Sequence, residues 1–317
     1  MLRVVARRVA ASIVTLLVIS VVIFWSVALL PGNSAQAILG RNATTTSVQV
    51  LESELHLNRP LVVRYGDWLA GFVTGNWGTS LASQQPVLHS IAVPLRNTLI
   101  LALFVLVLYV PLSLGIGVLS AWRRGGLVDV AFGVSTILGM AIPDFVLSVL
   151  LLFVVGVHLH WVPPVSEVQP GSGVLGYFQA IVLPGLALTA GMVAYTVRMM
   201  REGLIEAFES ESVVMARLKG LPSWRVIGFH ALPQALGPAL NITALNVAYL
   251  IGGVVVVETI FGYPGIGSTL VNAVTYRDVP VVEAVTLIMA GVYVLSNLAA
   301  DMLGMLFNPR LRDELAH

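Results

Sequence analysis

The sequence predicts an all-α membrane protein with six transmembrane helices and with both chain ends in the cytoplasm. Hydrophobic residues make up 57% of the 317 residues and charged residues only 10%, whereas soluble domains carry about 25%. Six runs are apolar and long enough to cross a hydrocarbon core of about 30 Å, which takes about 20 residues of helix. One such run could be the core of a soluble domain, but six indicate a polytopic protein.

The six predicted spans follow one another along the whole chain. They are approximately Val9–Leu30, Leu95–Trp122, Val128–Val157, Ile181–Met200, Leu240–Ile260 and Val281–Phe307. The first span could be mistaken for a signal peptide, because arginines precede it and Ala35-Gln36-Ala37 resembles a cleavage site. Its apolar run exceeds the roughly 7–15 residues of a signal-peptide core, so we expect a retained first helix.

The distribution of basic residues predicts the orientation. With the N-terminus inside, the inner segments hold Arg3, Arg7, Arg8, Arg123, Arg124, Arg198, Arg201, Arg217, Lys219, Arg225, Arg310 and Arg312. The outer segments hold only Arg41, Arg59, Arg64, Arg96 and Arg277. This asymmetry follows the positive-inside rule. The net charge of +1 indicates no nucleic-acid partner, and the absence of cysteine excludes disulfides and cysteine-based metal sites.

The long loop after the first span predicts a small folded cap outside the membrane. Trp68, Phe72 and Trp77 lie close together in it, which a mere spacer would not need. These aromatic residues fit the role of anchors at the membrane interface equally well. We therefore divide the chain into residues 1–94, the first helix with its outer loop, and residues 95–317, a core of five helices.

The longest polar stretch on the predicted inner side covers residues 198–238 and divides into two helices. Glutamates come early in the first helix, whereas Arg217 and Lys219 lie in its last turn, the order that the helix dipole favours. Gly220 suits the left-handed position that ends a helix, and Pro222 prevents its continuation.

The second helix of this stretch is predicted to begin at Ser223, whose side chain can cap it, and to end before Leu232-Pro233. Trp224, Ile227 and Ala231 give it an apolar face. Short amphipathic helices dock by laying such a face into a groove of a partner. The alternative is an ordinary cytoplasmic loop that lies on the lipid headgroups.

Short motifs in a fixed order give the chain a resemblance to a known family. They are Leu30-Pro31-Gly32, Leu57-Asn58-Arg59-Pro60 with Tyr65 and Trp68, Gly75-Asn76-Trp77-Gly78-Thr79-Ser80, Ala216-Arg217-Leu218-Lys219-Gly220-Leu221, His230-Ala231-Leu232, Glu258 through Gly267, Arg277-Asp278-Val279-Pro280, Asn297 through Asp301 and Asn308-Pro309-Arg310. Each is weak alone, but in this order they are specific. Over nearly its whole length the chain resembles the B-type permease subunit of dipeptide and oligopeptide ABC importers.

The resemblance implies the type I permease fold of ABC importers and a multi-pass subunit in a bacterial cytoplasmic membrane. The implied partners are a second, C-type permease, two ABC ATPase subunits, an extracytoplasmic peptide-binding protein and membrane lipid. The only lysine, Lys219, lies between Leu218 and Gly220, so the chain has no Walker A sequence. We expect no enzymatic activity and no cofactor in this chain, with ATP and Mg bound by the partner ATPases.

The resemblance also assigns the polar stretch to coupling helices, at about residues 206–236, that meet the ATPases. The coupling residues that it implies are Ser212, Ala216, Arg217, Lys219, Gly220, Leu221, His230, Leu232 and Pro233. Four of them match the importer pattern A-x-x-x-G, eleven residues, L-P. The chain departs from the family at Val214, where the general pattern has glutamate, and at Asn58, Asn76 and Asn308, where acidic residues are usual.

The turn after the fifth span resembles the outer gate of similar importers. It carries Glu258, Phe261, Pro264, Gly265 and Gly267. Glycine and proline permit a tight re-entrant loop that ordinary side chains would block. The alternative is a plain turn at the membrane interface.

Three polar residues inside the spans are candidates for the translocation pathway. A charge at mid-membrane costs about 2.5–3.5 kcal/mol on insertion scales, so each requires a reason. Asp144 follows Pro143, where we expect a kink that faces protein or water, and it either contacts a peptide amine or is satisfied by a neighbouring helix. Asn297 and Asp301 lie one turn apart on the sixth span, and hydrogen bonding between helices is the alternative to substrate contact.

Other functions require features that the sequence does not offer. His158 and His160 lack a third metal ligand, and there is no catalytic constellation. The same fold could import nickel chelates, glutathione or haem-like cargo. A secondary transporter driven by an ion gradient is the alternative from a different class. Uptake that is insensitive to loss of the ATPases would favour the secondary transporter.

Overall fold

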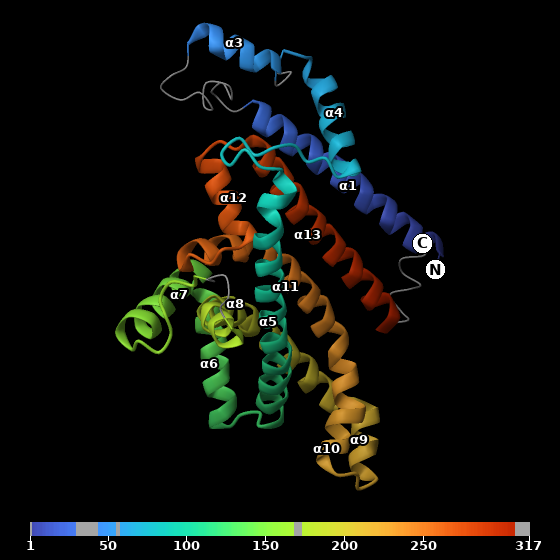
Figure 1. Ribbon diagram of the computed structural model, residues 1–317. Coiled ribbons are helices and arrows are strands. Elements are labelled where there is room, and N and C mark those ends of the chain that lie inside the picture. Colours follow the sequence, from blue (N-terminus) through green and yellow to red (C-terminus); the bar gives the residue numbers. More distant parts are fainter. Residues whose placement is uncertain (1, 30–43, 55–57, 168–172, 308–317) are drawn as a thin grey trace. The chain divides into compact units, whose positions relative to one another are not determined.

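The described part of the computed structural model is almost entirely helical, as Figure 1 shows, and covers residues 2–29, 44–54, 58–167 and 173–307. Its elements are α1 (Leu2–Ala28), α3 (Thr45–Glu54), α4 (Leu61–Thr74), α5 (Val87–Trp122), α6 (Leu127–Ala141), α7 (Asp144–Leu151), the π-helix η2 (Leu152–His158), α8 (Val174–Glu209), α9 (Glu211–Leu218), α10 (Ser223–Arg225), the π-helix η3 (Val226–Ala231), α11 (Leu232–Phe261), α12 (Ile266–Thr275) and α13 (Val279–Phe307). Extended pairing in these ranges is limited to a bridge between Thr79 and Pro86. The predicted all-α class is confirmed. Two predicted motifs, Leu30-Pro31-Gly32 and Asn308-Pro309-Arg310, lie outside the described residues, as does Leu57, the first residue of a third motif.

Within the described residues, four helices are individually long and apolar enough to cross a membrane: α1, α5, α8 and α13. The number rises to six if α6 with α7, and α11 with α12, each count as one span. The kink predicted at Pro143 is confirmed, because α6 and the helix from Asp144 to His158 are bent by 106°. Pro143 has no N–H to donate and holds the residue before it extended, which Ile142 is, at φ −86° and ψ 119°.

The described residues form two compact units, and each is considered by itself. The first contains residues 1–8, 99–263 and 295–317, and the second contains residues 9–98 and 264–294. The division of the sequence at residue 94 stays a prediction.

Helix α8 is the central helix of the first unit, and two-thirds of its apolar window, 67%, is buried. Small residues let its neighbours come close. A methyl group on Gly185 would lie 2.5 Å from the ring of Phe104, and one on Gly139 would lie 3.0 Å from Ala194. Such close approach is how helices associate in a membrane, where lipid removes most of the hydrophobic driving force.

The second unit has an aromatic face on α4 and an apolar core of its own. Phe72 stacks on Trp77 with ring centroids 4.9 Å apart, and Trp68 lies 6.1 Å from Phe72. Val87 and Ile91 at the start of α5 are buried with residues of α12 and α13. The described part of the outer loop is therefore folded rather than a spacer, and its place in the membrane stays a prediction.

Candidate functional site

The predicted coupling stretch forms one continuous region of the first unit, from α9 to the start of α11 (Figure 1). Its second helix differs from the prediction at both ends. Pro222, not Ser223, is the N-cap residue, and no side-chain capping bond forms there. The helix also does not end before Leu232-Pro233 but continues through η3 into α11. Pro233 has no N–H to donate to a carbonyl of the preceding turn, and the wider turns of the π-helix η3 end at Ala231, two residues before it.

Helix α9 ends in the geometry that the sequence predicts around Gly220. Gly220 has φ +74°. Its N–H donates to the Arg217 carbonyl at 2.9 Å, and the N–H of Leu221 donates to the Ala216 carbonyl at 3.2 Å. These two bonds form the Schellman motif, which satisfies carbonyls that the helix end leaves without partners.

The inner face of α9 anchors this turn to the rest of the first unit. Val213 and Ala216 are buried in a cluster that also contains Leu204 of α8 and Val226 and Ala231 of η3. Leu221 and Leu232 pack against the same cluster. Burying such side chains stabilises a fold by about 1.5–3 kcal/mol for each large one, so the turn is held in place from one side.

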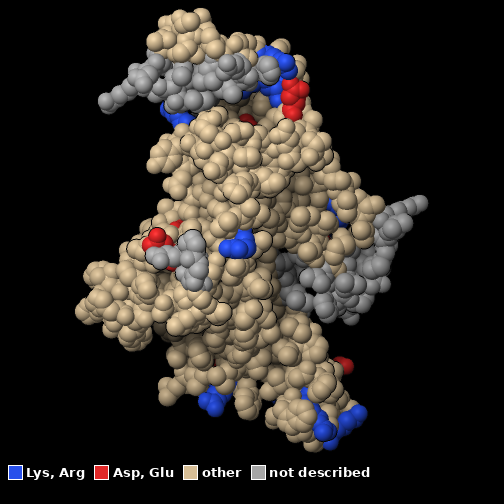
Figure 2. Space-filling view, viewed as in Figure 1, with Lys and Arg blue, Asp and Glu red and all other residues tan. Residues whose placement is uncertain are grey.

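The outer face of this region combines exposed apolar side chains with positive charge. Val214, Met215, Leu218, Trp224 and Phe229 are all exposed, and Leu218 reaches 76% exposure. Figure 2 shows Lys and Arg over α9 and α10 and over the α5–α6 turn, at the same end of the first unit, whereas most of the surface in view carries no charge. Clustered apolar side chains rimmed by polar groups mark protein or membrane contact sites.

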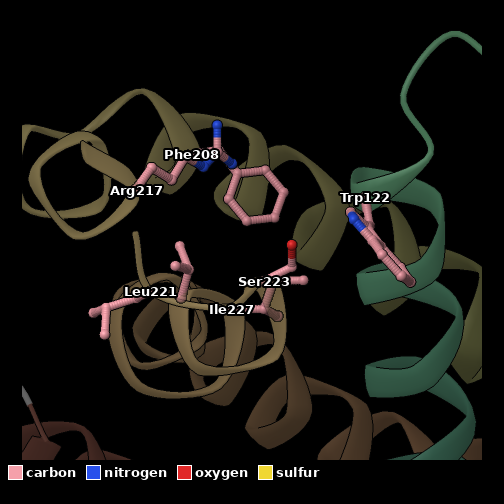
Figure 3. Close-up of a pocket in the computed structure, with 7 residues that line it drawn as sticks. Trp122, Phe208, Arg217, Leu221, Ser223 and Ile227 are labelled. Atoms are coloured by element: carbon pink, nitrogen blue, oxygen red, sulfur yellow. The ribbon is translucent and has the colours of Figure 1, made fainter. Parts of the chain in front are cut away.

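A pocket of about 200 Å³ opens in this region. It is lined by Trp122, Phe208, Arg217, Leu221, Ser223, Val226 and Ile227. Figure 3 shows Trp122 of α5 facing the coupling region across it, with Phe208 and Arg217 on the α8–α9 side. The Arg217 guanidinium lies 5.2 Å from the centroid of the Phe208 ring, a cation–π contact that holds the charge at the pocket wall.

One polar side chain joins two of the remaining predicted coupling residues, Ser212 and His230. The Gln234 amide donates to Ser212 Oγ at 2.9 Å and to the His230 carbonyl at 2.8 Å. Gln234 therefore ties α9 to the end of η3. Lys219 and Pro233 are exposed. The structure thus brings the nine predicted residues into one region, whereas contact with an ATPase stays a prediction.

Sequence reasoning missed Gln234, Trp122 and Phe208. Gln234 could have been noted as the polar residue directly after Leu232-Pro233, but the two aromatic residues carry no signal because they end ordinary apolar or amphipathic stretches.

The predicted gate residues are divided between the two units. In the first, Glu258 and Phe261 are buried at 0% and 1% exposure, and the Glu258 carbonyl accepts from the Tyr263 N–H at 2.9 Å. In the second, Asn97 Nδ2 donates to the Pro264 carbonyl at 2.8 Å. Gly265 precedes α12 and Gly267 is buried in it. The re-entrant loop and the gating role stay predictions.

The predicted pathway residues lie in separate contacts within the first unit. The Asp144 carboxylate accepts from the Tyr249 hydroxyl at 2.5 Å, so a neighbouring helix does satisfy it in part. Asp301 pairs with Arg8 of α1 at 2.8 Å, which agrees with a structural role. Asn297 is half-buried one turn before Asp301.

An ion pair between buried Asp129 and partly exposed Arg201, near the coupling region, was not predicted. Asp129 accepts from Arg201 Nε at 2.6 Å and from Arg201 Nη2 at 2.8 Å, and from the Ser120 hydroxyl at 2.6 Å. It joins α5, α6 and α8 where the coupling region meets the spans. In the sequence Asp129 stands five positions after Arg124, so it is easily mistaken for part of an exposed turn.

A second missed contact explains two family motifs together. In the second unit Asp278 accepts from the Ser80 hydroxyl at 2.5 Å and from the N–H groups of Leu81 and Ala82 at 3.0 and 3.3 Å. The motifs that end at Ser80 and begin at Arg277 are therefore the two sides of one loop anchor, although 198 positions separate Ser80 from Asp278.

Comparison with known proteins shows which families and which relatives the chain is similar to. The family described as "Binding-protein-dependent transport system inner membrane component" matches residues 113–313, and the N-terminal family of the same systems matches residues 1–102. A probable peptide ABC transporter permease protein of Sinorhizobium fredii is 33% identical over 306 residues, covering 96% of this chain and 98% of that protein.

Two further relatives carry more specific names. A dipeptide transport system permease protein of Alkalihalophilus pseudofirmus is 31% identical over 326 residues, with 96% of this chain and 98% of that protein covered. A glutathione transport system permease protein of Pectobacterium atrosepticum is 32% identical over 306 residues, with 96% and 97% covered.

Proposed function

Because the chain belongs to the family of binding-protein-dependent transport system inner membrane components, we propose that it is a permease subunit of an ATP-driven importer of dipeptides and oligopeptides. It forms the translocation pathway with a second permease subunit. Two ABC ATPase subunits supply the energy, and an extracytoplasmic binding protein delivers the cargo. The resemblance of relatives named for peptide and dipeptide transport over nearly their full length supports this cargo.

The coupling region is the single observation that carries the proposal. An importer without its own nucleotide site needs a rigid contact that passes movement of an ATPase to the spans. The turn at Gly220 is held from inside by buried Val213 and Ala216, while its outer face presents exposed apolar and basic side chains. This combination suits a helix that docks in the groove of a partner.

The Asp129–Arg201 ion pair gives the movement a route into the spans. Arg201 lies on α8, and a single residue, Ser210, separates the end of α8 from the start of α9. A rigid displacement of α9 is therefore passed to α8, and through the ion pair to α5 and α6. ATP and the binding protein would each stabilise one of two states of the pathway, which is how alternating access is driven.

Glutathione is the second candidate cargo, because one relative of similar identity is named for its transport. Glutathione is itself a small peptide with a free ammonium group. The two candidates therefore share the fold, the coupling region, the second permease and the ATPases, and differ in the binding protein that delivers cargo.

Affinity purification of the tagged chain in mild detergent tests the proposal. We expect two ATPase subunits, a second permease and a peptide-binding protein to co-purify. Gly220→Trp, at a position where an added Cβ atom meets nothing within 4 Å, should release the ATPases and leave the second permease bound. Gly115→Ala on α5, also in open space, is the matched control and should release nothing. Recovery of the wild-type chain alone would contradict the proposal.

A further inference from the structure

The carboxylate of Asp144 lies in a cradle made by two neighbouring helices. Asp144 is the first residue of α7, directly after the break at Pro143. A methyl group on Gly191 of α8 would lie 2.5 Å from its Oδ1, and one on Gly253 of α11 would lie 3.8 Å from its Oδ2. The absence of a side chain at Gly191 lets the carboxylate sit against α8, and at Gly253 the distance to α11 is an ordinary van der Waals contact.

The cradle opens toward the uncovered side of α11. Tyr249, which donates its hydroxyl to Asp144 Oδ2, is 55% exposed, and Leu245 and Val256 on the same face are 60% and 44% exposed. The opposite face of α11 is packed, since Leu250, Val254 and Val257 are buried in the core. The Asp144–Tyr249 pair therefore stands at a surface and not within the core of the unit.

Among the residues that the structure describes, no cation is paired with Asp144. The ion pairs of these residues involve other carboxylates, and none joins Asp144 to Lys, Arg or His. An ionisable side chain in a span is costly against lipid and is found facing the bundle interior or a water-filled cavity. This surface of α11 is therefore expected to face water or protein.

The neighbouring face of α8 is polar as well. Tyr195 follows Gly191 by one turn and is 45% exposed, and Arg198 and Glu202 continue the same face, paired at 3.1 Å. Residues at these spacings share one side of a helix. The stripe extends from the cradle toward the coupling region, as the wall of an aqueous route would.

We propose that Asp144 and Tyr249 bind the terminal ammonium group of the cargo as it passes through the pathway. This inference rests on the proposed function. A carboxylate and an ammonium group form a charge-assisted hydrogen bond, about twice as strong as a neutral one, and the Tyr249 hydroxyl can rotate from Asp144 to accept from the same ammonium. Every peptide with a free amino end carries this group whatever its side chains, so one site serves cargo of varied sequence.

Uptake by the complete complex in proteoliposomes is the first test. Asp144→Asn keeps the shape and the acceptor for Tyr249 but removes the charge, and we expect dipeptide uptake to fall about 10- to 100-fold at subsaturating cargo, as the loss of a charged hydrogen bond predicts. ATP hydrolysis stimulated by the binding protein should stay within about twofold. Asp67→Asn, which removes an exposed carboxylate of the second unit, is the matched control and should leave both rates unchanged.

The outcomes separate this inference from the proposed function. If the wild-type complex shows no ATP-dependent uptake, the proposed function fails. If the wild type transports and Asp144→Asn transports equally well, or loses ATP hydrolysis and assembly in proportion to uptake, the inference is overturned.

Thiol labelling gives an independent readout, because the chain contains no cysteine. Tyr249→Cys, in a complex with cysteine-free partners, should react about tenfold faster with a cationic thiol reagent than with an anionic one. Adding Asp144→Asn should remove that preference, and saturating dipeptide should protect the cysteine. Val134→Cys, 52% exposed on α6, should show neither charge preference nor protection. Equal rates for the two reagents at Tyr249→Cys, or the absence of protection, would overturn the inference.

Discussion

Replacing Gly220 by alanine tests whether the left-handed turn after α9 is what the ATPase partner recognises. Gly220 has φ +74°, and a methyl group there would meet nothing within 4 Å. The substitution therefore adds backbone strain and no clash within this chain. The strain is relieved if the α9–α10 turn melts, and the turn must then re-form on docking.

The magnitude follows from the conformation. A left-handed residue other than glycine costs about 1–2 kcal/mol, which is a factor of about 5–30 in an equilibrium constant. We expect Gly220→Ala to weaken ATPase binding by that factor. Gly220→Asn should weaken it less, because asparagine adopts this region several-fold more often than other residues, and Gly220→Val should weaken it most.

Titration of the purified ATPase onto the permease pair in nanodiscs measures this effect. Gly228→Ala is the matched control, because Gly228 lies in η3, also meets nothing within 4 Å and has no positive φ. Alanine is the better helix former there, by about 1 kcal/mol, so its affinity should equal or exceed that of the wild type. Wild-type affinity for Gly220→Ala, or an equal loss for Gly228→Ala, would refute the reasoning.

Two further substitutions test the contacts that the sequence did not reveal. Asp129→Asn should destabilise the permease by about 1.5–3 kcal/mol, because the hydrogen bonds from Arg201 lose their carboxylate partner, and thermal unfolding in detergent measures this; a melting temperature like that of the wild type would contradict it. Asp278→Ala should speed hydrogen exchange at Leu81 and Ala82 about fivefold or more, because each loses a bond of about 1 kcal/mol, while ATPase binding stays unchanged. Unaltered exchange at both amides would show that Asp278 does not anchor this loop.

Local chemistry made the helix ends of the coupling region readable from the sequence. Glycine at a left-handed position followed closely by proline predicts a helix end, and the Schellman bonds of Gly220 and Leu221 confirm it. The cap was predicted one residue late, because a helix can begin with extended proline at the N-cap position and needs no serine there. The continuation past Pro233 depends on the wide turns of η3, which no local propensity indicates.

Contacts between distant segments were beyond sequence reasoning. Pro143 predicted a kink, but not a bend of 106°, because the packing of α7 against α8 and α11 decides the angle. Asp144 was recognised as unusual, yet its partner Tyr249 is 105 positions away. Arg8 and Asp301 are 293 positions apart, and nothing in either local sequence indicates the pair.

ATP-dependent uptake by reconstituted complexes tests the central claim most directly. Radiolabelled dipeptide would be offered to proteoliposomes that contain the two permeases, with and without the ATPases, the binding protein and ATP on the ATPase side. We predict uptake only when all of these are present. Uptake by this chain without ATPases, driven by an ion gradient, would contradict the account and identify a secondary transporter instead.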